Sequence, residues 1–152
     1  MFWCCALVSG QESSEIYLFD LEEKDSTISI SNPINISNSA GYDNQPSFTE
    51  DGTGILFSSF RNGQADVAKY FINEKYRVWI TNTEANEFSP MSYPGKKKNF
   101  TCVRLNEDET QLLYKYTYKK KPAEIMIPNT TVGYYLWFNE KTLISYVIGD
   151  TE

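Results

Sequence analysis

The sequence predicts an all-β fold built from repeated four-stranded units. Turn-forming pairs such as Asp51-Gly52 and Asn62-Gly63 separate short apolar runs. Aromatic residues make up 15% of the chain, and their flat side chains pack well on a pleated surface. A similar pattern returns after about 44 residues. Because no segment carries a helical apolar period with caps, we expect little or no helix.

Composition excludes several classes of function. The chain has 152 residues, a net charge of −6 and a pI near 4.7. This acidity argues against nucleic acid and against an anionic membrane surface as partners, because both attract basic patches. The chain has no histidine, so the commonest general base and metal ligand is missing. We therefore expect no catalytic residues, no metal site and no cofactor.

The first ten residues, MFWCCALVSG, form a short apolar run that ends in small residues. This pattern is typical of the end of a secretory signal peptide cut after Gly10, although an ordinary first strand has the same composition. The run is too short to span a bilayer. If the cut occurs, Cys102 is the one cysteine left, and no internal disulfide forms. Residues 11–152 are then the folded part.

A repeat of about 44 residues organises the rest of the chain. Pro46 matches Pro90, and Tyr70 matches Tyr114, each at a spacing of 44 residues. A third copy follows, with Trp137 89 residues after Phe48. Upstream, the triplet Glu15-Ile16-Tyr17 stands where Asp66-Val67-Ala68 stand in the clearest copy.

Each copy reads as four short strands, which in the clearest copy are QPSFT, GILFSSF, DVAKYFI and RVWITN. Four strands repeating at this length are the sequence signature of a β-propeller blade. The predicted units are a partial blade 15–38, a blade 44–82, a blade 87–128 and a partial blade 132–149. A β-sandwich is the structural alternative, but it predicts no repeat of fixed length.

The predicted units add up to about three blades' worth of strands, whereas closed propellers have roughly four to eight blades. An open arc exposes apolar sheet faces and unpaired strand edges. We therefore expect an incomplete ring that is completed either by further blades or by self-association.

Residues 43–70, DNQPSFTEDGTGILFSSFRNGQADVAKY, resemble the repeat of TolB-like propellers, a WD-repeat-like class. The resemblance lies in Pro46 and Phe48, the Glu50-Asp51-Gly52 turn, Arg61 with Gly63, and Asp66 with Val67. It implies an exported bacterial protein, periplasmic or at the cell surface, that binds other proteins of the envelope, including a peptidoglycan-associated lipoprotein. The same repeats also form accessory domains of exported peptidases and amidohydrolases. A glycan-binding propeller is a third alternative.

The loops at one end of the predicted ring are the candidate binding surface, because loops held by a rigid scaffold often carry function. The candidate partner-binding residues are Tyr42, Asp43, Asn44, Arg61, Asn62, Glu84 and Asn86. The alternative is that these residues are ordinary soluble connections. Asp66 is expected to cap the neighbouring loop by accepting backbone N–H bonds, with Arg61 as its ion-pair partner.

Three further features have simpler interpretations. Lys96 to Lys98 and Lys119 to Lys121 lie at the opposite end, as a basic patch or as solvated turns. Asn106 to Glu109 offers oxygen ligands for calcium but lacks the spacing of an EF-hand loop. Cys102 lies within a predicted strand and is expected to be a small core residue.

Overall fold

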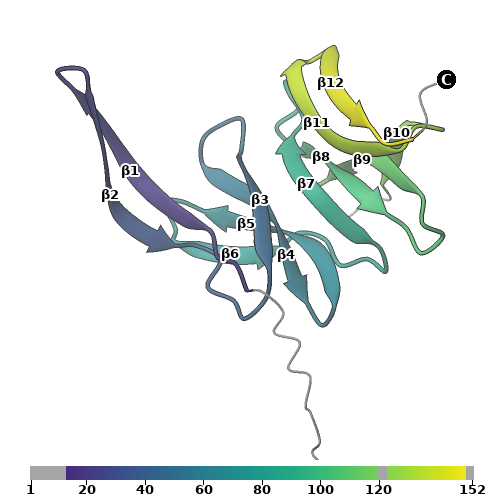
Figure 1. The fold of residues 1–152 in the computed structure, drawn as a ribbon, viewed down its shortest axis with the longest axis horizontal. Coiled ribbons are helices and arrows are strands. Elements are labelled where there is room, and N and C mark those ends of the chain that lie inside the picture. Colours follow the sequence, from purple (N-terminus) through teal and green to yellow (C-terminus); the bar gives the residue numbers. More distant parts are fainter. Residues whose placement is uncertain (1–12, 120–122, 150–152) are drawn as a thin grey trace, which may run out of the picture.

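A computed structural model describes residues 13–119 and 123–149, which contain strands and no helix (Figure 1). The proposed signal segment, residues 1–10, lies outside the described residues. The twelve strands are β1 (Tyr17–Lys24), β2 (Thr27–Asn35), β3 (Asp43–Phe48), β4 (Gly54–Arg61), β5 (Gln64–Phe71), β6 (Tyr76–Trp79), β7 (Asn86–Ser92), β8 (Asn99–Leu105), β9 (Gln111–Thr117), β10 (Glu124–Ile127), β11 (Val132–Asn139) and β12 (Thr142–Val147). In the part of the chain that the structure describes, no helix is long and apolar enough to cross a membrane.

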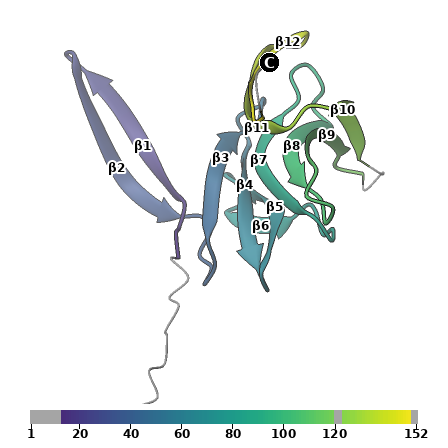
Figure 2. The same ribbon diagram turned by 45° about the vertical axis from the view of Figure 1, so that its right-hand side comes forward.

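The strands form four antiparallel sheets in chain order (Figures 1 and 2). Two sheets have four strands each, β3-β4-β5-β6 and β7-β8-β9-β10, and they pack against each other as consecutive blades. The other two sheets are the hairpins β1-β2 and β11-β12, which lie at opposite ends of the molecule. The predicted all-β propeller arc is confirmed, and the described residues do not close a ring.

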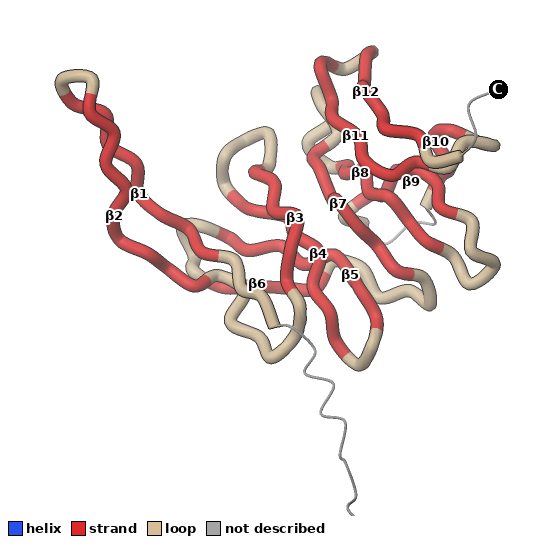
Figure 3. The backbone as a smooth tube through the Cα atoms, in the orientation of Figure 1, coloured by secondary structure: helices blue, strands red, loops and turns tan. Residues whose placement is uncertain are grey.

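Tight turns occur where the sequence places turn chemistry (Figure 3). Asn62 and Gly63 connect β4 to β5 with φ values of 53° and 82°, and Arg61 pairs with Gln64 across them. Two successive positive φ values define the hairpin turn whose twist matches that of the strands, which is why Asn-Gly is preferred there. The register of β4 and β5 is fixed by this turn.

Strand β4 is buried on both faces. Ile55 and Phe57 pack with Ile16 and Ile36, which flank the base of the β1-β2 hairpin. Leu56 points the other way, into a cluster with Phe100 and other residues of the next blade. The continuous apolar run of β4 therefore reflects the burial of both its faces, one by the next blade and one by the residues at the base of the hairpin.

The repeat is visible in the backbone as well as in the sequence. Gln45 and Ser89, 44 residues apart, both have positive φ, at 54° and 50°. Each lies within a register shift of the first strand of its sheet. The Gln45 side chain joins the two copies, since its Oε1 accepts a hydrogen bond from the Ser89 backbone N–H at 2.7 Å.

One alignment made from the sequence is wrong by two residues. Tyr70 pairs with Ile55, and the corresponding pair in the next sheet is Tyr116 with Phe100. Tyr116, not Tyr114, therefore occupies the place of Tyr70. One extra residue lies in the turn between β7 and β8, since Phe48 pairs with Ile55 but Ser92 pairs with Phe100. The second lies in the connection after β8, where Asn106 bonds to Thr110, whereas Arg61 pairs with Gln64.

Candidate functional site

A network of buried acids and hydroxyls joins the two complete blades. It consists of Asp66, Thr81, Thr83, Glu87 and Tyr116, and we call it the junction network. The Thr81 and Thr83 hydroxyls donate to the two oxygens of the Glu87 carboxylate at 2.8 and 2.6 Å. Tyr116 donates to Glu87 at 3.0 Å, and the Thr83 N–H donates to Asp66 at 3.2 Å. The predicted capping role of Asp66 is confirmed.

The same arrangement occurs one blade earlier. Glu15 takes the place of Asp66, Ser37 and Ser39 take the places of the two threonines, and Asp43 takes the place of Glu87. Ser37 donates to Glu15 and Ser39 to Asp43, each at 2.5 Å. The Ile16 N–H donates to the Ser37 hydroxyl, as the Val67 N–H does to Thr81. The predicted match of Glu15-Ile16-Tyr17 with Asp66-Val67-Ala68 is confirmed by these bonds.

The junction network supports structure and offers no catalytic constellation. Glu87 is fully buried, and this burial raises the pKa of its carboxyl above the usual range although three hydroxyls donate to it. Burial likewise raises the pKa of the Cys102 thiol, and Cys102 packs in the core as expected. Neither group lies open to a substrate, so both are better suited to holding blades together than to chemistry.

Arg61 stands at the edge of the junction network and also reaches the surface. Its Nη2 lies 2.9 Å from the Asp66 carboxylate, which confirms the predicted ion pair, and 2.7 Å from the Asn82 Oδ1. Its guanidinium carbon lies 4.1 Å from the centre of the Trp79 ring. Arg77 approaches the same ring at 5.5 Å. We call Arg61, Arg77 and Trp79 the arginine–tryptophan cluster.

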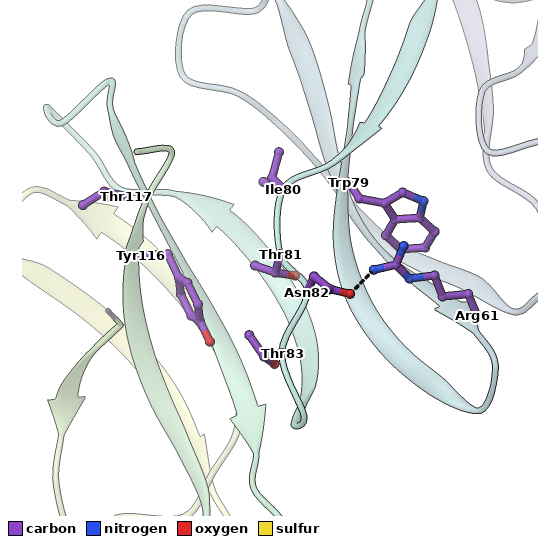
Figure 4. A pocket seen from close by; sticks show the side chains of 8 residues that line it. All are labelled: Arg61, Trp79, Ile80, Thr81, Asn82, Thr83, Tyr116 and Thr117. Atoms are coloured by element: carbon purple, nitrogen blue, oxygen red, sulfur yellow. Dashed lines mark hydrogen bonds between the residues drawn. The ribbon is translucent and has the colours of Figure 1, made fainter. Parts of the chain in front are cut away.

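Two hollows flank this cluster. The larger, of about 570 Å³, is lined by Arg61, Trp79, Ile80, Thr81, Asn82, Thr83, Tyr116 and Thr117 (Figure 4). The second, of about 420 Å³, is lined by Ser39, Ala40, Gly41, Phe60, Arg61, Asn62, Gly63, Arg77 and Trp79. Arg61 and Trp79 therefore form the wall between two concave surfaces at one end of the blades.

The arginines retain donor capacity for a ligand. Arg61 uses Nε and Nη2 in its bonds to Asp66 and Asn82. The Nη1 of Arg77 is buried and has no hydrogen-bond partner among the described residues. A ligand rich in acceptor oxygens would bind the guanidinium atoms of Arg61 and Arg77 that line the hollows, whereas the buried Nη1 of Arg77 is out of its reach. The cluster thus has the chemistry to bind an acidic or carbonyl-rich segment.

The structure brings the predicted binding residues to one end of the blades, but in different environments. The Phe60 N–H donates to the Tyr42 carbonyl, and the Arg61–Asn82 bond brings the loop after β6 to the same end. Tyr42, Asn62 and Glu84 are exposed there. Asp43 is buried in the earlier copy of the network. Asn44 is half-buried, and the Asn86 side chain accepts the Ala65 N–H at 2.9 Å.

Arg77 and Trp79 are absent from the sequence-based candidates. Both lie on β6, the outer strand of its sheet, whereas the sequence reasoning looked for binding residues in loops. The available signal was the Arg-Val-Trp triplet, which places a cation and a large aromatic ring on the same face of a strand. These residue types dominate the energetics of many protein interfaces.

The remaining candidates are local structures. Asp108 accepts the N–H and hydroxyl of Thr110, and the hydroxyl bond lowers the pKa of the Asp108 carboxyl. Within residues 13–119 and 123–149, no group of three or more acids or cysteines is arranged to hold a metal ion. Lys96 to Lys98 lie in the turn before β8 and Lys119 follows β9, while Lys120 and Lys121 fall outside the described residues.

Comparison with known proteins bears on the fold. No protein-family model and no curated protein matches the chain. Among solved structures, it is similar to the putative TolB from Agrobacterium tumefaciens, with a TM-score of 0.56 and 15% identity over 73% of this chain and 45% of that chain. It is also similar to TolB from Acinetobacter baumannii, with a TM-score of 0.48 and 15% identity over 77% of this chain and 30% of that chain. The chain therefore spans less than half the length of either protein, and its described residues have the fold of part of a TolB-like propeller.

Proposed function

We propose that this chain is a non-enzymatic, protein-binding propeller module of the TolB-like type that acts in the bacterial envelope. The observation that carries the proposal is the arginine–tryptophan cluster between two hollows. Trp and Arg are the residue types that most often supply binding energy at protein interfaces, especially when they line pockets. The exposed Tyr42 and Asn62 lie at the same end and extend the surface.

The site favours a peptide or protein segment over a small substrate. Two guanidinium groups lie within 5.5 Å of the centre of its aromatic ring, so the site combines cationic and apolar surface. The described part of the site contains no histidine and no exposed nucleophile next to a base. An extended segment with acidic or carbonyl oxygens would fill both hollows and pass over the Arg61–Trp79 wall.

The envelope location is supported by two observations. Residues 1–10 have the composition of a signal-peptide remnant, and the fold is similar to that of the putative TolB from Agrobacterium tumefaciens. The proposed compartment is therefore the periplasm or the cell surface. A peptidoglycan-associated lipoprotein is the first candidate partner to titrate.

The test is retention of envelope proteins by the immobilised chain, followed by titration of the purified lipoprotein. Arg77→Glu reverses a charge in the arginine–tryptophan cluster and is expected to weaken binding by about tenfold or more, the size of a moderate hot spot. The matched control replaces Lys96, Lys97 and Lys98 with Gln at the opposite end and is expected to leave binding unchanged. Equal binding by native chain and Arg77→Glu, or loss in the lysine control alone, would refute the assignment.

A further inference from the structure

The two terminal hairpins are complementary halves of one blade. The Ile36 N–H donates to the Ile16 carbonyl, as the Ile80 N–H does to Val67. These bonds make β1 and β2 the counterparts of β5 and β6, the outer half of a sheet. At the other end, the Ile148 N–H donates to the Thr131 carbonyl, as the Phe60 N–H does to Tyr42. Strands β11 and β12 are therefore counterparts of β3 and β4, the inner half.

Each half exposes the edge that the other half would pair with. In the complete sheets, the second strand pairs with the third along eight residue pairs in one blade and seven in the other. The second strand of the C-terminal half is β12, and the third strand of the N-terminal half is β1. In the described part of the chain, both have a neighbour on one side only. Unpaired edges of this kind are templates for another strand.

Exposed apolar side chains are concentrated on the same hairpins. On β11-β12, they lie on the face turned away from the preceding blade, with Phe138 the most exposed at 77%. The set on that face is Tyr134, Leu136, Phe138, Ile144 and Tyr146. On β1-β2 the exposed set includes Tyr17, Phe19, Leu21, Ile28 and Ile30. Groups of exposed apolar side chains gathered on one element mark contact surfaces.

Blade 44–82 offers a surface that fits the exposed face of β11-β12. Phe48 on β3 is 63% exposed, whereas Trp137, in the corresponding place on β11, packs against the preceding blade. A small apolar groove of about 130 Å³ lies beside Phe48 and is lined by Ile16, Tyr17, Leu18, Pro46, Ser47, Phe48 and Ile55. This groove is where the inner strands of the preceding blade would lie.

We propose that a second copy of this chain supplies those strands, and that two copies close one six-bladed ring. In each of two composite blades, β11 and β12 of one copy continue into β1 and β2 of the other. One chain closing on itself would make a ring of three blades, below the range of known propellers, and its two hairpins lie at opposite ends of the molecule (Figures 1 and 2). Each copy contributes the twelve described strands, so two copies supply 24 strands, enough for six four-stranded blades, which falls within the range.

The repeat also fixes the register of the new strand pair. Ile148 corresponds to Phe60, so Ser145 corresponds to Phe57, whose partner in β5 is Ala68. Ala68 corresponds in turn to Tyr17. In the composite blade, Ser145 of one copy therefore lies opposite Tyr17 of the other. Opposite residues in antiparallel strands have Cα atoms about 4.5–5.5 Å apart, which is a distance that a disulfide spans.

The first test is a cross-link between two singly substituted chains, both carrying Cys4→Ser and Cys5→Ser. Mixing Tyr17→Cys with Ser145→Cys under mild oxidation is expected to give a covalent dimer. The matched control mixes Leu21→Cys with Ser145→Cys; Leu21 lies four residues further along β1, roughly 13 Å away, and is out of reach. Equal cross-linking in both mixtures, or none in either, overturns the proposal.

The second test is sedimentation of the native chain. A dimer of the 17.5 kDa chain is expected, and Ile144→Lys with Tyr146→Lys is expected to give a monomer because both side chains are exposed in the isolated chain. Tyr76→Lys is the control, since Tyr76 is an exposed aromatic residue on β6, outside the proposed contact. A soluble native monomer, open polymers larger than a dimer, or a dimer that survives the two lysines each contradict a closed two-copy ring.

Discussion

Whether Arg61 primarily stabilises the blade can be measured with a double-mutant cycle on Arg61 and Asp66. Asp66 is 1% exposed, and Nε and Nη2 of Arg61 lie 3.2 and 2.9 Å from its Oδ2. Hydrogen bonds to charged groups contribute about 1.5–3 kcal/mol. Because about a third of the Arg61 side chain is open to water, solvent screening reduces this figure. We expect a coupling energy of about 1–2 kcal/mol.

The assay is urea denaturation of native chain, Arg61→Met, Asp66→Asn and the double variant, at pH 7 and one protein concentration. Arg61→Met keeps an apolar stem against Trp79 but leaves the Asp66 carboxylate buried without its cation, so it is expected to cost the most, about 2–3 kcal/mol. Asp66→Asn is expected to cost less, because Arg61 keeps its bond to Asn82. A coupling energy below about 0.3 kcal/mol, the limit of ordinary additivity, would refute the structural role of the pair.

Four further predictions concern stability. Burial raises the pKa of Glu87 in the folded chain, so ionisation of Glu87 opposes folding. The free energy of unfolding of Glu87→Gln minus that of the native chain should therefore grow as pH rises from 4 to 7. Urea titrations that give a constant or falling difference would contradict this. Hydrogen bonds from Thr53 and Thr49 lower the pKa of the exposed Asp51 to about 2. The contribution of Asp51 to the free energy of unfolding, at most about 1 kcal/mol after screening, should be present above pH 4 and lost towards pH 2. Urea titrations of Asp51→Ala should lack that pH dependence. Phe57→Ala should cost about 3–5 kcal/mol because Phe57 is fully buried; a loss below about 1 kcal/mol in thermal or urea unfolding would contradict its place in the core. Gly63→Ala should cost about 1 kcal/mol or more, since φ is 82° there, and an unchanged unfolding midpoint would argue against this turn.

The fold could be predicted from the sequence to a useful degree because its determinants are local. Asp51-Gly52 and Asn62-Gly63 specify turns through their own conformational preferences, and the apolar run of β4 indicates a strand covered on both faces. The alignment of Tyr70 with Tyr114 failed because the turn before β8 and the connection after it each hold one more residue than in the earlier blade, which together shift the later strand by two residues. Only strand pairing, which is a long-range property, shows that Tyr116 is the counterpart.

The candidate site was less accessible to sequence reasoning. The Arg61–Asp66 pair is separated by one tight turn, so its members could be linked from the sequence. The contact of Arg61 with Trp79 depends on the pairing of β5 with β6 and has no local signal. The exposure of Tyr42 and the burial of Asp43 could not be separated either, since adjacent strand residues point to opposite faces and the buried face had to be known first.

The junction network has a consequence for how the chain unfolds. Glu87 belongs to the later blade, whereas two of its three hydroxyl donors, Thr81 and Thr83, belong to the segment that leaves the earlier blade. These two blades therefore cannot separate without stranding a buried acid. At the last junction, Val132 stands where Asp43 and Glu87 stand in the earlier copies, and it is fully buried in an apolar cluster. Repeat arrays unfold according to the strength of their nearest-neighbour contacts. Amide hydrogen exchange should therefore show residues 43–117 opening as one cooperative unit, with the hairpin 132–147 exchanging independently and earlier.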